Sequence, residues 1–327
     1  MITVSHFNRD PRPSNYTFEQ LFGAIRLELS KNIHVINHDI PAGMGRIASV
    51  RWAKKNAGKI NHITGDVHFL SYGLPSKNTI LTVHDLGYYT TTLKGVKKMI
   101  YKKFWLEDPF KKVDTITAIS QATKIDIMEH FHVAEEKIII IPDPLLPGFE
   151  REQPNQNTKP VIMQIGSGAN KNLERLIDAV SGLDVKLLLV NKLFDPRIKA
   201  KLLESKVEFE QRTDLSFEEL KLAYKDADML FFASEYEGFG MPIIEAQATG
   251  RPVITSTISC MPDVAGDNSA LFVDPLSVSE IRNAINTLIE SESIRNGIIQ
   301  NGFQNIQKYS IESIAAMYEK LYLKYAD

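Results

Sequence analysis

The chain has 327 residues, which is long enough for two domains of ordinary size. Its hydrophobic share of 43% and charged share of 24% exclude a disordered or fibrous protein, and a formal net charge of −2 gives no general case for nucleic-acid binding. The single cysteine, Cys260, excludes an internal disulfide framework and a cysteine-rich zinc site. The first residues lack the apolar core of a signal peptide, and no apolar run reaches membrane-spanning length. We therefore expect a cytoplasmic protein.

Strand and helix patterns alternate along the chain in two blocks. Apolar strand patterns in the first block lie at residues 2–7, 33–40, 59–64, 79–86, 114–120 and 137–143, with a helical pattern at 17–29. The proline-rich, polar segment 142–160 is typical of a linker. The second block has strand patterns at 160–166, 185–190, 207–210, 229–234, 251–256 and 270–274, and helical patterns at 170–181 and 310–325. Such alternation predicts two doubly wound α/β domains facing across a cleft.

The expected boundaries follow from this rhythm. We predict an N-terminal domain at 1–150, a second domain at 156–308, and a C-terminal helix at 309–327 that packs back toward the N-terminal domain. Two helices have the sequence of a capping box at their start, Ser216 with Glu219 and Ser277 with Glu280.

The stretch EGFGMPIIEA (237–246) follows a strand pattern and opens a predicted helix. Loops at the carboxyl end of a parallel strand are where α/β sheets bind ligands, and helix N-termini favour anions and hydroxyl-rich groups. Glu237 and Glu245 can then face one cleft. The local residues leave an alternative open, in which Glu237 is a solvated loop residue and Glu245 interacts with the helix dipole.

The stretch IGSGANKN (165–172) also joins a strand pattern to a helix pattern. Its glycines allow backbone amides to approach a phosphate, and Lys171 adds a positive charge. Gly166 and Gly168 resemble the start of a dinucleotide fingerprint, but the third glycine is missing. A simple tight turn is the alternative interpretation.

Other polar residues at strand ends are His84 and Asp85, for which a structural role is the alternative. His62, Asp66 and His68 lie at another strand end, but they lack the helical two-histidine pattern of zinc proteases, so we predict no metal site there.

An Asp-x-Asp motif, Asp226 and Asp228, resembles a manganese-binding signature of one class of sugar-transfer enzymes. It precedes a strand pattern instead of following one. We therefore expect it at the edge of the sheet away from the ligand, in a solvated turn between a helix and a strand.

Together these motifs resemble glycosyltransferase family 4, the retaining GT-B glycosyltransferases, also called glycosyl transferases group 1. The most specific part is EGFGMPIIEA, which resembles the family's Glu-x-Phe-Gly-hydrophobic-Pro-x-x-Glu-Ala signature. The resemblance extends through AISQATKIDIMEHFHVAEEKIIIIPDP (118–144), QIGSGANKNLERLIDAV (164–180) and TGRPVITSTISCMPDVAGDNSALFVDP (249–275). It covers most of residues 78–290.

The resemblance implies an N-terminal Rossmann-like domain that binds the acceptor and a C-terminal one that binds a nucleotide-sugar donor. By position, Glu245 accepts hydrogen bonds from the ribose hydroxyls, Glu237 lies beside the donor sugar, and Lys171 neutralises the diphosphate. His84 resembles a histidine near the sugar. The backbone expected to hold the donor belongs to Gly166, Ser167, Gly238, Phe239, Gly240 and Met241.

Three departures from the family pattern stand out. Asn170 occupies the position of an arginine that usually precedes the lysine, so a second cation would have to come from Arg9, Arg12 or Arg212. The segment NRDPRP (8–13) replaces a glycine pair that usually follows the first strand, and Asp263 replaces a glutamate.

The function implied is a retaining, hexosyltransferase-type enzyme that moves a sugar from a nucleotide-diphosphate sugar to a glycan or lipid-linked glycan. Neither a cofactor nor a metal is expected, because Lys171 and a helix N-terminus can stabilise the leaving diphosphate while Glu237 stabilises positive charge on the sugar ring. Two alternatives remain, a nucleotide-sugar epimerase of the same fold and a non-catalytic binding subunit of a glycan-assembly complex.

Residues 93–109 form a basic helical pattern. On a helical wheel Val96, Met99, Ile100 and Phe104 share one side, which we expect to pack on the sheet, whereas the other side carries Lys94, Lys98, Tyr101, Lys102 and Trp105. A basic face with aromatic residues suits an anionic membrane, so we predict peripheral contact with the inner face of the cell membrane through residues 94–105. An ordinary solvated helix is the alternative.

Overall fold

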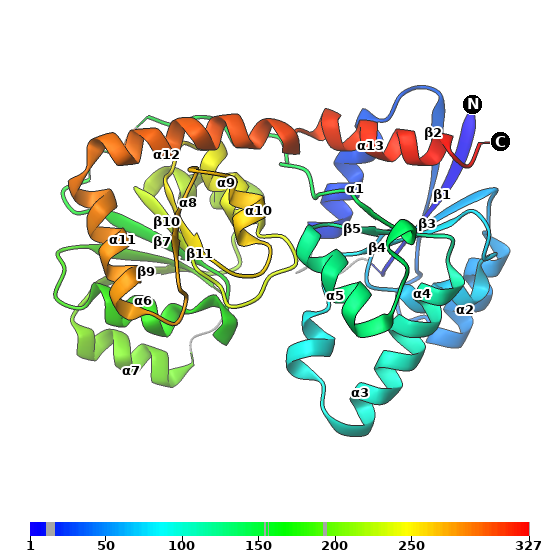
Figure 1. Cartoon of the computed structure of the whole chain (residues 1–327), viewed down its shortest axis with the longest axis horizontal. Helices are drawn as coiled ribbons and strands as arrows, with labels where there is room; N and C mark the ends of the chain where they lie inside the picture. The colour runs from blue at the N-terminus through cyan, green and yellow to red at the C-terminus, as the bar shows by residue number, and fades with distance from the viewer. Residues whose placement is uncertain (11–16, 154, 156, 192–194, 327) are drawn as a thin grey trace. The chain divides into compact units, whose positions relative to one another are not determined.

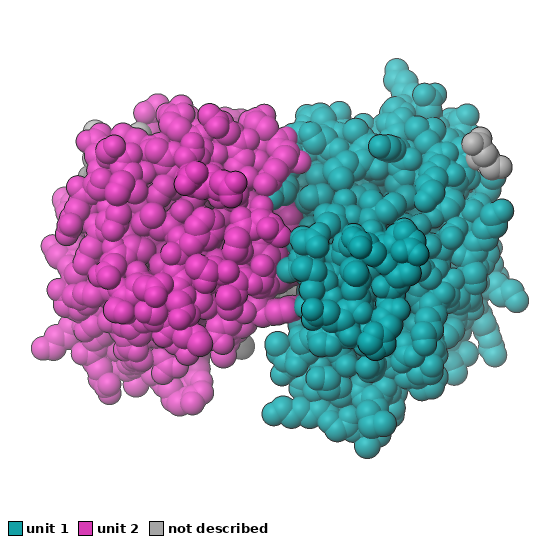
Figure 2. Space-filling model, viewed as in Figure 1, with its two compact units in different colours: residues 1–146, 309–327 teal, residues 147–308 magenta. Residues whose placement is uncertain are grey.

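The computed structural model describes residues 1–10, 17–153, 155, 157–191 and 195–326. The chain divides into two compact units (Figure 2). Unit 1 comprises residues 1–146 and 309–327, and unit 2 comprises residues 147–308. Each unit contains a six-stranded sheet.

Unit 1 is built on a parallel sheet with the strand order β2-β1-β3-β4-β5-β6. Its strands are β1 (Ile2–Asn8), β2 (Ile33–Asp39), β3 (Ile60–Ile63), β4 (Thr79–Val83), β5 (Thr115–Ala118) and β6 (Ile138–Ile140). Every residue of β3, β4 and β5 is buried. This burial explains their runs without polar–apolar alternation, because both faces of a parallel sheet are usually covered.

The helices of unit 1 come from both ends of the chain. They are α1 (Thr17–Glu28), α2 (Arg46–Lys55), α3 (Gly95–Tyr101), α4 (Asp108–Lys112), α5 (Gln121–Phe131) and α13 (Ile311–Leu323), with shorter helical turns η1 (His68–Gly73), η2 (Tyr88–Thr92), η3 (Lys102–Glu107) and η4 (Glu135–Lys137). Figure 1 shows α13 beside α1. Ile314 and Tyr318 of α13 pack into one apolar cluster with Val4 and Phe22.

Unit 2 has the strand order β12-β11-β10-β7-β8-β9, again with all pairs parallel. The strands are β7 (Val161–Ile165), β8 (Lys186–Val190), β9 (Glu208–Arg212), β10 (Met229–Phe232), β11 (Val253–Ser256) and β12 (Leu271–Val273). The helical elements are η5 (Ala169–Lys171), α6 (Leu173–Val180), α7 (Pro196–Ser205), α8 (Phe217–Asp226), α9 (Met241–Ala248), α10 (Met261–Ala265), α11 (Val278–Glu290) and α12 (Glu292–Asn305), and η6 (Ile306–Tyr309) follows them.

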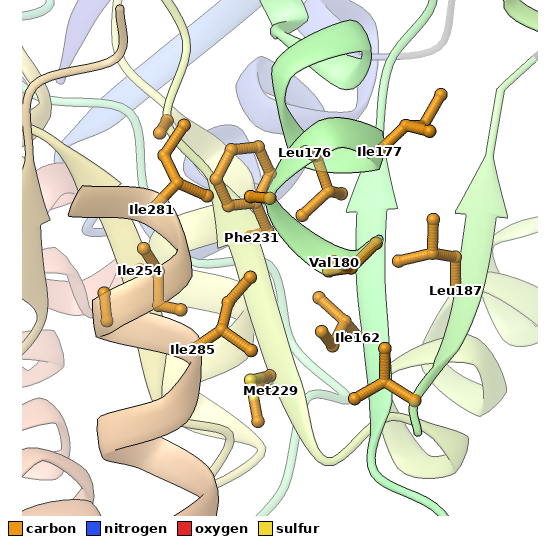
Figure 3. Packing of buried hydrophobic residues seen from close by; sticks show 14 of the residues in the cluster. Ile162, Leu176, Ile177, Val180, Leu187, Met229, Phe231, Ile254, Ile281 and Ile285 are labelled. Carbon is orange, nitrogen blue, oxygen red and sulfur yellow. The ribbon is translucent and has the colours of Figure 1, made fainter. Parts of the chain in front are cut away.

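One face of the unit 2 sheet packs against α6 and α11 (Figure 3). Leu176 and Val180 of α6 and Ile285 of α11 point toward Ile162 and Phe231 on the strands. All five side chains are fully buried, and burying each one stabilises the unit by about 1.5–3 kcal/mol. The apolar spacing predicted for the helix at 170–181 therefore forms the core that fixes the loop before it.

The predicted strands are all present, and two helix starts differ from expectation. The helix predicted over 170–181 begins at Leu173, after the separate turn η5. Ser216 and Glu219 form the predicted capping box. At the second site Ser277 accepts a hydrogen bond from the Glu280 amide, but the Glu280 carboxylate accepts from the Asp274 amide at 2.8 Å. That site is therefore only half of a capping box.

The predicted packing of residues 93–109 is wrong. The side expected to face the sheet is exposed, while Tyr101 and Trp105 pack against the core of unit 1. The reason is that the segment has apolar side chains on both sides. Tyr101, Trp105 and Leu106 pack into the core of unit 1, and a helical wheel alone does not show which side the rest of the chain covers.

Within the described residues no helix has both the length and the apolar composition needed to cross a membrane.

Candidate functional site

The strand order of unit 2 places a topological switch point between β7 and β10. From β7 the chain adds β8 and β9 on one side, and then returns to place β10 on the other side. In open α/β sheets ligands bind beyond the carboxyl ends of the strands at such a point. The two loops that leave the sheet there are residues 166–172 and 233–240, which are the two stretches selected from the sequence.

Hydrogen bonds join these two loops. The Asn170 carbonyl accepts from the Glu235 amide at 2.9 Å, and the Asn170 side-chain amide donates to the Tyr236 carbonyl at 3.0 Å. The Asn172 side chain donates to the Ala233 carbonyl at 3.1 Å. Asn170, which stands where the family resemblance expects an arginine, therefore orders the opposite loop and contributes no charge.

Lys171 and Glu237 form an ion pair at this junction. The Lys171 Nζ atom donates to Glu237 Oε1 at 2.5 Å and lies 5.0 Å from the centre of the Phe232 ring. Both side chains are partly shielded, with exposed fractions of 21% and 14%. The interpretation of Glu237 as a solvated loop residue is therefore wrong. Each of these two charges is the counter-ion of the other.

Gly166 makes room for the Lys171 side chain. Its φ angle is +105°, and a Cβ atom at this position would lie 2.7 Å from Lys171 Cε. Both the backbone conformation and the close approach favour glycine. Gly166 and Ser167 line a cavity of unit 2 with Gly168 and Arg175.

The turn after β11 holds the loop that carries Glu237 through hydrogen bonds. Ser259 Oγ donates to the Glu237 carbonyl at 3.0 Å and accepts from the Glu237 amide at 3.3 Å. Cys260 Sγ donates to the Phe239 carbonyl at 2.9 Å. Burial raises the pKa of the Cys260 thiol, so it remains a neutral donor. Neither Ser259 nor Cys260 was predicted to support the loop, although their place in a serine-rich turn after a strand was a signal.

Glu245 occupies a different environment from Glu237. It is buried on α9, and its Oε2 atom accepts a 2.6 Å hydrogen bond from the Tyr224 hydroxyl of α8. Burial raises the pKa of Glu245 to about 7, although the bond from Tyr224 acts in the opposite direction. A buried carboxylate with so high a pKa is typical of a ligand-binding or catalytic position. Tyr224 was not predicted, because it lies 21 residues away on another helix.

The remaining predicted donor-binding residues form the turn into α9. Gly240 is the N-cap residue with a φ angle of +102°, and Met241 begins the helix. Phe239 is buried, and Gly238 precedes it in the loop. Pro242 lies in the first turn of α9, as predicted, where the helix does not need its missing amide.

The arginines considered as replacements for Asn170 are held elsewhere. Arg212 pairs with Glu210 at 2.7 Å and with Asp226 at 2.8 Å. Arg9 pairs with Glu19 at 2.7 Å in unit 1, and Arg12 lies outside the described residues. The loop pair is instead contacted by Arg175, whose Nη1 atom donates to Glu235 at 2.7 Å.

His84 lies in unit 1, at the carboxyl end of β4. Its Nε2 atom is 2.8 Å from the Thr64 carbonyl, and the Phe18 ring stacks on the imidazole at 3.8 Å. Its Nδ1 atom has no hydrogen-bond partner in the described part of the chain, and Asp143 is 3.9 Å away. His84 and Asp85 line a cavity of unit 1 with Asp66, His68 and several aromatic residues.

The other histidines of this region are structural. His62 contacts the Tyr322 hydroxyl at 2.7 Å and the Thr82 hydroxyl at 2.7 Å, and burial lowers the pKa of His62 to about 3. His68 contacts the Trp105 carbonyl at 3.1 Å. No group of three or more metal-ligating side chains occurs among the residues that the structure describes.

Asp226 and Asp228 lie at the amino end of β10, as predicted, on the opposite edge from the loop pair. Asp228 is more than a solvated turn residue, because its Oδ2 atom accepts from the Val161 amide at 2.8 Å and from Asn157 at 2.9 Å.

Comparison with solved structures identifies the fold. The chain resembles the Anabaena protein Alr3699/HepE, solved in complex with UDP and glucose, with a TM-score of 0.78 at 14% identity over 99% of this chain and 100% of that one. It also resembles WaaG, a glycosyltransferase involved in lipopolysaccharide biosynthesis, with a TM-score of 0.71 at 12% identity over 98% of this chain and 99% of that one. The fold is GT-B.

Sequence comparison agrees with the structural one. Residues 148–305 match the family model of glycosyl transferases group 1, and this range contains both loops of the candidate site. The GT-B chain is 27% identical to the MMP alpha-(1->4)-mannosyltransferase of Mycolicibacterium hassiacum and 28% identical to the O-antigen chain mannosyltransferase RfbU of Salmonella typhimurium, over 65% of its length in each case. It spans 55% and 61% of the lengths of these relatives.

Proposed function

We propose that the protein is a retaining glycosyltransferase of family 4 that transfers a hexose from a nucleotide-diphosphate sugar to a glycan or lipid-linked glycan. The observation that carries the proposal is the Lys171–Glu237 pair at the switch point of unit 2. The group 1 match over 148–305 supports it. The names of the two relatives, both mannosyltransferases, favour mannose as the first sugar to test.

Donor binding begins with an exchange of partners at Lys171. A diphosphate carries more negative charge than one carboxylate, so it competes with Glu237 for the ammonium group. Charge that develops on the leaving diphosphate is stabilised by Lys171 and by backbone amides of residues 166–168, without a metal or cofactor. Gly238, Phe239, Gly240 and Met241 supply the backbone around the sugar.

Glu237 acts after the Lys171 ammonium group has left its carboxylate and bound the diphosphate. Its carboxylate then lies beside the sugar without its counter-ion, where it stabilises the positive charge that develops on the ring. Hydrogen bonds from Ser259 and Cys260 to the loop backbone hold this carboxylate in position. Attack from the face that the diphosphate leaves gives retention. His84 is included as a further sugar-binding residue because of the family resemblance.

Glu245 holds the nucleoside. Its carboxylate already accepts one bond from Tyr224 and has capacity for ribose hydroxyl donors. Hydrogen bonds of this charged kind contribute about 1.5–3 kcal/mol each.

In this proposal the enzyme works at the cytoplasmic side of the membrane. Its acceptor is a growing glycan or the lipid carrier of that glycan. The proposal also includes contact of unit 1 with an anionic membrane.

A ligand screen followed by a turnover assay tests the proposal. GDP, UDP, ADP and their hexose conjugates are added separately, and the thermal midpoint of the protein is followed, because ligand binding stabilises the native state by mass action. The donor that binds is then incubated with and without a glycan acceptor. Release of nucleotide diphosphate that increases with acceptor supports transfer. Conversion of the donor sugar without acceptor indicates an epimerase, and binding without any turnover indicates a non-catalytic subunit.

A further inference from the structure

Five large apolar side chains of unit 1 are exposed along α2, α3 and η3. Their exposed fractions are 73% for Ile47, 71% for Val96, 72% for Met99, 55% for Ile100 and 53% for Phe104. Val96, Ile100 and Phe104 follow one another at intervals of four residues, and Ile47, Ile100 and Phe104 line one groove with Tyr72 and Tyr88. We call these five side chains the apolar patch. Figure 1 shows α3 protruding from unit 1.

The apolar patch is not needed by the core of unit 1. The same helical segment already has a packed side, on which Leu106 and Phe110 are buried and Tyr101 and Trp105 are partly buried. The Trp105 ring stacks on Tyr101 at 5.6 Å and lies 4.7 Å from Phe69. Tyr101 and Trp105 also line the groove at the edge of the apolar patch. An exposed apolar surface beyond a side that is already packed marks an interaction site.

The two helical segments that carry the patch are basic, and the acidic residues nearest to them in sequence, Glu107 and Asp108, pair with Lys103 and Lys111. Residues 94–105 contain Lys94, Lys97, Lys98, Lys102 and Lys103 and no acidic residue, and residues 46–55 contain Arg46, Arg51, Lys54 and Lys55 and no acidic residue. Lys98 and Lys102 point at the rings of Tyr89 and Phe131, and Lys103 pairs with Asp108 at 2.7 Å. Lys94 and Lys97 make no ion pair with any described residue.

We propose that the apolar patch docks unit 1 on an anionic lipid bilayer, with its five side chains at the acyl boundary and Lys94 and Lys97 at the headgroup phosphates. The charge complementarity favours this occupant over another protein, because lysine is depleted at protein–protein interfaces. An apolar surface inside a basic rim is the pattern of a helix that lies in a membrane interface. The inference rests on the membrane contact included in the proposed function and names the surface that makes it, but its test does not depend on the identity of the sugar donor.

This assignment reverses the side predicted from the sequence. Tyr101 and Trp105 are partly buried against the core of unit 1, and Lys98 and Lys102 are already engaged with aromatic rings. The side chains that contact the lipid are those expected to pack on the sheet.

Vesicle flotation with purified full-length protein tests the proposal. Vesicles of phosphatidylcholine mixed with phosphatidylglycerol should bind the protein, vesicles of phosphatidylcholine alone should bind much less, and salt should weaken the binding. The double variant Lys94→Glu/Lys97→Glu should lose roughly 25-fold in partition coefficient or more, at about fivefold for each lysine. The double variant Met99→Ser/Ile100→Ser should lower the partition coefficient about fourfold for each methylene group that no longer reaches the acyl boundary.

Matched controls come from unit 2. Lys199→Glu reverses an exposed charge, and Leu222→Ser removes an apolar side chain that is as exposed as Phe104. Neither should change vesicle binding. All variants should keep the thermal midpoint of the parent and its shift with nucleotide diphosphate, so that lost vesicle binding cannot be assigned to unfolding or to the donor site.

Three results would overturn the proposal: equal binding to both kinds of vesicle, no binding to either, or an equal loss in the control variants. Sedimentation velocity adds a fourth. If the parent is a dimer that Met99→Ser/Ile100→Ser disperses, the apolar patch is an interface between two copies of the chain.

Discussion

Glu245→Gln is expected to stabilise the protein at alkaline pH while it weakens donor binding. The native pKa of Glu245 is about 7, whereas the ordinary value is 4.5. Between these values the unfolded chain has lost the proton and the folded chain has kept it, so the free energy of unfolding falls as pH rises. This contribution to stability is complete below pH 4.5 and is lost as pH rises through about 7.

The size of the effect follows from the two pKa values. Their difference corresponds to about 3 kcal/mol, at 1.36 kcal/mol for each pKa unit. Glutamine is nearly isosteric, and its side-chain oxygen can still accept the bond from Tyr224, but it has no proton to lose. At about pH 5 the variant and the parent should differ little, and at about pH 8 the variant should be more stable by roughly 2–3 kcal/mol.

Urea unfolding at both pH values measures this difference. Both tryptophans, Trp52 and Trp105, belong to unit 1, so tryptophan fluorescence follows that unit, and far-ultraviolet circular dichroism is needed to follow unit 2. Glu290→Gln, which neutralises an exposed carboxylate of unit 2, is the control and should change stability by only a few tenths of a kcal/mol. An equal gain at both pH values, no gain at about pH 8, or the same gain in the control would refute the reasoning.

Three further outcomes are expected at the loop pair. Glu237→Gln should lower turnover strongly yet keep or tighten the affinity for bare nucleotide diphosphate, because Lys171 loses its competing partner; isothermal titration beside a rate assay decides this, and weaker binding would contradict it. Lys171→Ala should nearly abolish transfer, whereas a chelator should leave the parent active; inactivation by the chelator, reversed by manganese, would contradict this prediction. Gly166→Ala should weaken diphosphate binding more than Gly182→Ala does, since both have positive φ but only the first Cβ would collide with Lys171, and equal effects in a titration would exclude the steric explanation.

The elements and the two loops of the candidate site could be recognised from local sequence. Strands such as β7 and β10 are short apolar runs because they are buried on both faces. Loops at their carboxyl ends were recognisable by glycine, by Lys171 and by Glu237. Each of these features is formed by residues that are close together in the chain, so it can be recognised in the sequence.

The contacts inside the site could not be predicted in the same way. Pairing of Lys171 with Glu237 requires β10 to lie beside β7, and the bond from Tyr224 to Glu245 joins two helices. Neither of these two contacts produces a periodic pattern in the sequence. The orientation predicted for residues 93–109 was wrong because apolar side chains lie on both sides of this segment, and a helical wheel does not show which side the rest of the chain covers.

The Lys171–Glu237 pair also bears on how the site discriminates among phosphorylated small molecules. A lysine without a carboxylate partner, in a loop that leads into a helix, would attract many of the phosphate esters in a cell. Here an incoming anion must first separate a 2.5 Å ion pair, which a singly esterified phosphate, with less charge and fewer oxygens, does poorly. The site is therefore expected to resist inhibition by nucleoside monophosphates and sugar phosphates, and to keep its lysine available for a ligand that delivers two phosphoryl groups together.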